Sequence, residues 1–97
     1  METQTYRFTW QGIGIEVIYV PRYHGGIVAH LTVRSIAPVS APLPITRTGY
    51  LSHFHQPGTI EARGGDVVAQ VIAWLDEEAT SVEWQAHVNA SRQGTLL

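Results

Sequence analysis

Two histidines separated by one residue, His53 and His55, are the side chains whose spacing is best suited to chemistry. If the segment that carries them is extended, both imidazoles project to the same side, because side chains alternate along a strand. Such a His-x-His pair is a common clamp for zinc or iron. The alternative is that both rings lie in a polar loop and bind backbone groups or solvent. A third ligand would have to come from His24, His30, Glu61 or Asp66.

Most other catalytic chemistry lacks the residue types that it needs. The chain has no cysteine, which excludes disulfides, iron–sulfur clusters and thiolate zinc sites. All six basic residues are arginines, so a lysine Schiff base and a P-loop lysine are excluded as well. Ser52 precedes His53 directly, but neighbours on a chain seldom face each other and no nucleophile elbow surrounds them. The sequence therefore predicts no cofactor, with zinc at the histidine pair as the alternative.

Three early segments have the composition of strands and predict an antiparallel meander. In the first, Tyr6, Phe8 and Trp10 alternate with polar residues and share one face. The second is rich in β-branched residues and is expected to end at Pro21, which cannot donate a hydrogen bond to a sheet. The three segments are residues 5–10, 15–20 and 27–36.

The middle of the chain shows no regular pattern. Residues 37–48 are rich in proline and predict an extended connection. The stretch Tyr50–Phe54 that follows fits an edge strand, a short helical turn or an ordered loop. This choice decides whether His53 and His55 point the same way.

A helix is predicted over residues 66–79, with Asp66 as its N-cap. A second helix is predicted over residues 81–91, where Thr80 and Glu83 fit a capping box. The apolar face of the first helix follows the spacing i, i+3, i+4, i+7 with Val68, Val71, Ile72 and Leu75, and Val67 and Trp74 widen it.

Together these elements predict one domain, residues 1–97, of the α+β class. Its core is a three- to four-stranded antiparallel sheet with one or two C-terminal helices packed on one face. The other face of the sheet would carry the apolar residues Ile18, Val20 and Val28. Such a face needs cover, which predicts a homodimer formed through that face or a strand edge.

Composition narrows the class of partner. Charged residues are 14% of the 97, against roughly 25% in an average domain, which suggests that a partner covers part of the surface. The net charge of −2 and the scattered arginines disfavour a nucleic-acid partner, which would have to use Arg22, Arg34 and Arg47. No apolar run approaches the ~20 residues that span a bilayer. We therefore expect a cytoplasmic protein with no membrane partner and no signal peptide.

Two groups of residues are candidates for binding a protein partner. Tyrosine and arginine are enriched in binding hot spots, because they combine contact area with polar reach. An acidic group near the end of the first helix could dock on a basic surface and raise the association rate. The first group is Arg22, Tyr23, Arg47 and Tyr50, and the acidic group includes Asp76 and Glu77.

Four segments resemble a family of small proteins found on plasmids and other mobile elements of proteobacteria. They are LPITRTGY (43–50), SHF (52–54), GGDVV (64–68) and AWLDEEA (73–79). The resemblance implies a cytoplasmic accessory protein of a mobile element, one that meets host defence machinery, and it transfers no catalytic residues. The leading interpretation is a non-enzymatic protein-interaction module that acts as an inhibitor or adaptor of a larger host or element-encoded protein. The alternative is a metal-binding module or metal-dependent hydrolase at His53 and His55.

Overall fold

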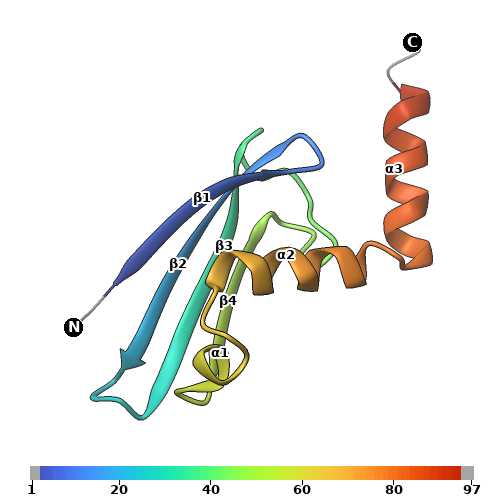
Figure 1. Cartoon of the computed structure of the whole chain (residues 1–97). Coiled ribbons are helices and arrows are strands. Elements are labelled where there is room, and N and C mark those ends of the chain that lie inside the picture. Colours follow the sequence, from blue (N-terminus) through green and yellow to red (C-terminus); the bar gives the residue numbers. More distant parts are fainter. Residues whose placement is uncertain (1–2, 95–97) are drawn as a thin grey trace.

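The protein folds into one antiparallel sheet followed by helices, as a computed structural model that describes residues 3–94 shows. The four strands lie in the order β1-β2-β3-β4, and each pairs antiparallel with the next (Figure 1). The predicted α+β class is therefore confirmed. The elements within the described residues are β1 (Gln4–Trp10), β2 (Ile13–Tyr23), β3 (Val28–Ala37), β4 (Tyr50–His55), α1 (Thr59–Ala62), α2 (Val67–Glu78) and α3 (Val82–Gly94).

The core lies between one face of the sheet and α2. Alternation in β1 places Tyr6, Phe8 and Trp10 on this face, as the sequence predicts. On α2, Val67, Val71 and Leu75 of the predicted apolar face are buried, whereas Val68 is only half-buried. The sheet contributes Trp10, Ile15, Val17, Tyr19, Ala29, Leu31 and Val33, and α2 contributes Val67, Val71 and Leu75.

Both ends of α2 are fixed by side-chain hydrogen bonds. At its start, the Asp66 carboxylate accepts a hydrogen bond from the Ala69 N–H at 3.0 Å, so the predicted N-cap is confirmed. Near its end, the Trp10 indole Nε1 donates to Asp76 Oδ1 at 2.8 Å. This bond ties the last turn of α2 to the end of β1.

The predicted capping box at Thr80 is wrong. The Thr80 hydroxyl donates to the Glu77 carbonyl at 2.8 Å, so it closes the last turn of α2. The Ser81 hydroxyl accepts from the Trp84 N–H at 3.1 Å and caps the start of α3 instead. Beyond Val88, which packs against the edge of the core, α3 stands away from the sheet (Figure 1).

The predicted end of the second strand at Pro21 is also wrong, because β2 continues to Tyr23. Between Val20 and Tyr23 the register shifts, with Val20 opposite His30 and Tyr23 opposite Val28. One extra residue in β2 makes a β-bulge there, and a bulge leaves a residue out of the hydrogen-bond ladder. Proline is tolerated at such a position because its missing N–H is not needed.

The sheet face away from α2 carries a buried carboxylate between two arginines. Glu16 lies directly opposite Arg7 on one neighbouring strand and Arg34 on the other. Its Oε2 is 2.8 Å from Arg7 Nη2 and its Oε1 is 2.7 Å from Arg34 Nη2. The hydrogen bonds from Arg7 and then Arg34 hold the pKa of Glu16 below its ordinary value. The two ion pairs of Glu16 therefore stabilise the fold fully at pH values above the unfolded-state pKa of Glu16. This contribution is lost as the pH falls through the lower folded-state pKa.

Candidate functional site

The segment that carries the two histidines is the edge strand β4. It pairs with β3 so that His53 lies opposite Leu31 and His55 opposite Ala29. Both imidazoles therefore point to the α2 side of the sheet, with their ring centroids 5.5 Å apart and nearly parallel at 21°. The prediction that an extended segment would place both rings on one side is confirmed.

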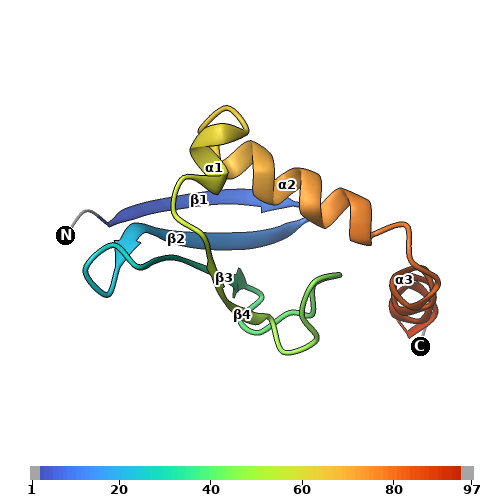
Figure 2. The same ribbon diagram turned by 90° about the horizontal axis from the view of Figure 1, so that it is seen from below.

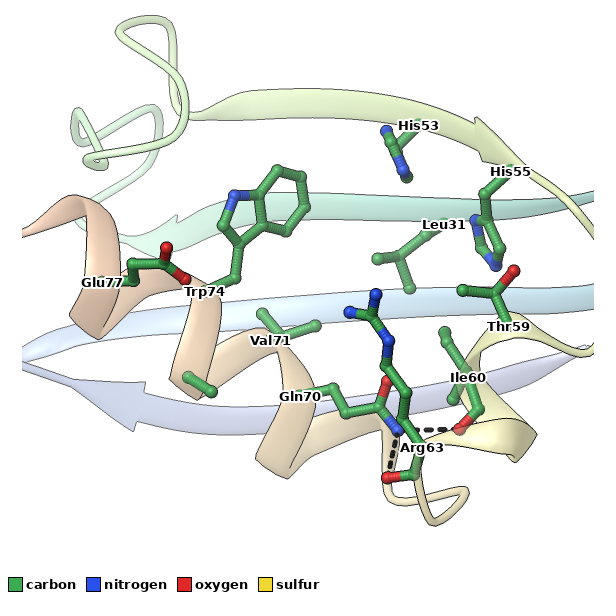
Figure 3. Close-up of a pocket in the computed structure, with 11 residues that line it drawn as sticks. Leu31, His53, His55, Thr59, Ile60, Arg63, Gln70, Val71, Trp74 and Glu77 are labelled. Carbon is green, nitrogen blue, oxygen red and sulfur yellow. Dashed lines mark hydrogen bonds between the residues drawn. The ribbon is translucent and has the colours of Figure 1, made fainter.

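A cleft of about 430 Å³ opens between β4 and α2 (Figure 3). It exists because α2 packs nearer to β1 than to β4 (Figure 2), so the inward side chains of the edge strand β4 stay partly exposed. Leu31 and Val71 form its apolar floor, and Trp74 of α2 faces His53 across it with ring centroids 5.5 Å apart. The Arg63 guanidinium points into the cleft at the α1 end, and Glu77 lies at the opposite end (Figure 3).

His55 lies at the α1 end of the cleft, with both of its ring nitrogens buried and without a hydrogen-bond partner in the described part of the chain. Its ring stacks on Tyr19, with centroids 6.1 Å apart and planes at 9°. Burial lowers the pKa of His55 first, and the neighbouring His53 lowers it further, while Glu61 acts in the opposite direction. The lowered pKa favours the neutral ring, whose donor and acceptor bond no group of the described residues. Such groups cost stability unless a partner supplies the missing hydrogen bonds.

Tyr19 fixes the position of the nearby carboxylate. Its hydroxyl donates to Glu61 Oε2 at 2.8 Å. Burial raises the pKa of Tyr19 to about 12, and the hydrogen bond to Glu61 adds to the shift. Tyr19 is therefore a hydrogen-bond donor throughout the physiological pH range.

The burial of His55 makes stability depend on pH. Because its folded-state pKa lies below the unfolded-state value of 6.5, the unfolded chain takes up a proton first as the pH falls. We expect the free energy of unfolding to decrease as the pH falls from 7.5 through 6.5 and below, as measured by urea unfolding at each pH. His55→Gln should flatten this dependence. An unchanged slope in His55→Gln would contradict the assignment.

The metal interpretation gains no support from the geometry. Among the described residues, no group of three or more histidine, cysteine, aspartate or glutamate side chains could hold a metal ion. The histidine pair thus lacks the third ligand that a zinc site needs. The four candidates for that ligand contact other groups: His30 bonds Ser52, Glu61 accepts from Tyr19, Asp66 caps α2, and His24 packs edge-on against Tyr23.

The residues predicted to bind a protein lie in separate places on the molecule. Glu77 lines the cleft, whereas Asp76 accepts the hydrogen bond from Trp10. Arg47 lines a second hollow, of about 490 Å³, between the proline-rich connection and the start of α3. Tyr50 is 53% exposed at the start of β4.

Tyr23, the last residue of β2, belongs to an aromatic cluster with His30 of β3 and Phe54 of β4. Its ring centroid is 5.3 Å from that of His30 and 5.7 Å from that of Phe54. Arg22 is exposed next to it. The structure therefore brings His53, His55 and Glu77 to one cleft and leaves the other predicted residues outside it.

Two residues of the cleft, Arg63 and Trp74, were not among the predicted site residues. Trp74 follows Val71 by three positions, so helical spacing places it at the flank of the buried stripe. That spacing was the available signal for Trp74. For Arg63 no local signal exists, because its place depends on how α1 packs on the sheet.

Among the described residues, no helix is both long and apolar enough to cross a membrane.

Comparisons with curated proteins and with solved structures find no match. A family model described as the KlcB third domain matches residues 3–84, and KlcB is a plasmid-encoded protein of IncP plasmids. The match covers the whole sheet, α1, α2 and the cleft, and it ends in the first turn of α3. The chain therefore belongs to the KlcB third-domain family, which confirms the plasmid association that the sequence resemblance implies.

Proposed function

We propose that this chain is a non-enzymatic protein-interaction module and that a partner protein docks in the cleft between β4 and α2. In this proposal it acts in the cytoplasm as an inhibitor or adaptor of a larger host or plasmid-encoded protein. The family description supports the proposal, because a third domain works in a protein that has other domains. The domains of one protein contact one another through interfaces that resemble those between separate proteins.

The observation that carries the proposal is the cleft itself, which brings an arginine and a tryptophan together beside the two histidines. The His55 ring nitrogens are buried without partners, and the Arg63 guanidinium forms no ion pair with any described residue. Beside them the half-buried Trp74 offers an aromatic wall. Tryptophan and arginine at a concave site are typical of interface hot spots.

The proposal is tested by capture of partners with the tagged chain from a lysate of plasmid-bearing cells, with two variants run in parallel. Trp74→Ala removes the wall of the cleft, and loss of a hot-spot tryptophan weakens binding by roughly 30-fold. Phe54→Ala is the matched control, because Phe54 is an exposed aromatic residue that points to the opposite sheet face. Circular dichroism checks that both variants are folded.

We expect one stoichiometric partner that the unmodified chain and Phe54→Ala capture and Trp74→Ala loses. A second copy of the chain would appear as a dimer mass in light scattering, with the same dependence on Trp74. Capture that is identical in all three proteins, or no specific partner and no dimer, would overturn the proposal.

A further inference from the structure

The outer edge of β4 presents unpaired backbone groups. β4 is the last strand of the sheet, and no strand of the described residues pairs with its outer edge (Figure 1). The Ser35 N–H donates to the Gly49 carbonyl at 2.8 Å, so these two residues form a hydrogen-bonded pair that continues the register of β3 and β4. In an antiparallel ladder such pairs alternate with pairs whose N–H and C=O groups point away from each other. The backbone groups of Tyr50, Ser52 and Phe54 therefore point to the free edge.

Two of these three residues keep both of their outward groups free. The Tyr50 carbonyl accepts from the Thr46 and Thr48 hydroxyls at 2.8 and 3.2 Å, so it points away from β3 and is already occupied. No described residue bonds the outward N–H or C=O of Ser52 or Phe54. Both residues are exposed, so a strand of another molecule can reach these groups.

The spacing of the free groups fits a second copy of the same strand. Two identical strands related by a two-fold axis pair residue i with j and residue j with i. With the axis at His53, Ser52 of each copy lies opposite Phe54 of the other, and every free N–H of one copy meets a free C=O of the other. In this register Tyr50 lies opposite Gln56, whose carbonyl already accepts a hydroxyl hydrogen bond from the start of α1 at 2.8 Å. Pairing therefore ends where the free groups end.

The side chains of β4 are compatible with this pairing. The strand contains no aspartate, glutamate, lysine, arginine or proline and pairs with β3 without a bulge, so it lacks several devices that protect edge strands from each other. On the α2 side, the half-buried Leu51 of one copy lies opposite the half-buried His55 of the other. The other edge of the sheet is different, because β1 carries Arg7 at its centre and two copies paired there would bring like charges together.

We propose that two copies of this chain form a dimer by pairing their β4 strands antiparallel about a two-fold axis at His53. The two sheets then become one continuous sheet, and α2 of both copies lies on the same face of it, because antiparallel pairing about this axis keeps the faces of the sheet. The inference does not rest on the proposed function, since it uses the edge of β4 and not the wall of the cleft. The paired segment is short, so the dimer dissociates on dilution.

The first test changes a backbone donor at the edge. Ser52→Pro removes an outward N–H that makes no bond within the described chain, whereas Ser52→Ala keeps this N–H and loses only the side-chain contact with His30. Sedimentation equilibrium at micromolar concentrations, with a chelator present, measures the dissociation constant of the dimer. We expect Ser52→Ala to dimerise like the unmodified chain. Ser52→Pro should raise the dissociation constant roughly tenfold or more, because the dimer loses one hydrogen bond on each side of the axis.

The second test uses the residue on the axis. His53 of one copy faces His53 of the other, so His53→Asp places two carboxylates side by side and should also weaken the dimer roughly tenfold or more. An equimolar mixture of His53→Asp and His53→Arg should restore a dimer, because opposite charges then meet. Thr5→Asp adds the same charge at an exposed position of the opposite edge strand and should leave the dissociation constant unchanged. Circular dichroism checks that each variant is folded.

A chain that stays monomeric at every concentration would overturn this inference. So would a dimer that persists in both Ser52→Pro and His53→Asp, or a mixture of the two His53 variants that fails to associate. A dimer that Trp74→Ala abolishes and Ser52→Pro leaves intact would place the second copy in the cleft, so the β4 pairing would fail and the proposed function would stand. If the dimer depends on Ser52 and capture of a partner protein does not depend on Trp74, the proposed function fails instead.

Discussion

Leu75→Ala is expected to lower the free energy of unfolding by about 3–5 kcal/mol, because Leu75 has no exposed surface and lies in the core between α2 and the sheet. The loss combines the transfer free energy of the removed atoms with the cost of the cavity that remains. Domains of this size have a total stability of about 5–15 kcal/mol, so the variant would be only marginally folded. Urea unfolding followed by tryptophan fluorescence measures the change.

Two variants control for position and for volume. Leu75→Met conserves volume and is expected to cost less than about 1.5 kcal/mol. Ile72→Ala truncates a residue that only packs against the edge of the core, so its cost should be clearly smaller than that of Leu75→Ala. Equal costs at Leu75 and Ile72 would mean that α2 does not bury the stripe Val67, Val71 and Leu75.

Local patterns were enough to predict most of the elements. Alternation in β1 and the 3.6-residue spacing in α2 reflect which side chains face the core, and both follow from a few neighbouring residues. The cap at Asp66 is local too, since its carboxylate bonds an N–H three residues away. Pro21 misled the strand prediction because a bulge, which depends on the partner strand, removes the need for its N–H.

The cleft could not be predicted, because it results from long-range packing. It depends on α2 lying toward β1, which the hydrogen bond between Trp10 and Asp76 fixes across 66 positions of sequence. The same bond offsets the unfavourable position of Asp76 in the last turn of α2, where the helix dipole disfavours negative charge. The orientation of His53 and His55 was predictable only on condition that their segment was a strand. Pairing with β3 determines that, and the short sequence Tyr50–Phe54 does not.

Gly49→Ala is the second variant with a large expected effect, a loss of about 3 kcal/mol in the free energy of unfolding. Gly49 has φ +73°, a left-handed conformation that costs other residues about 1–2 kcal/mol. An added Cβ would also lie 2.7 Å from the Ala41 carbonyl oxygen, closer than such atoms approach. That oxygen cannot move freely, because it accepts a hydrogen bond of 2.6 Å from the buried Ser35 hydroxyl.

Gly12→Ala separates the two causes of this loss. Gly12 has nearly the same φ, +78°, but no heavy atom of a described residue other than its chain neighbours lies within 4 Å of the place where its Cβ would be. Gly12→Ala should therefore lower the free energy of unfolding only by the cost of the left-handed backbone conformation, about 1 kcal/mol. Equal losses in urea unfolding would show that the contact with Ala41 is relieved at no cost. A larger loss at Gly49 would mean that the proline-rich connection is held rigidly against the start of β4. The Gly49 carbonyl also accepts a hydrogen bond from the Ser35 N–H at 2.8 Å. Gly49 therefore helps to hold β4, which carries His53 and His55, in register with β3.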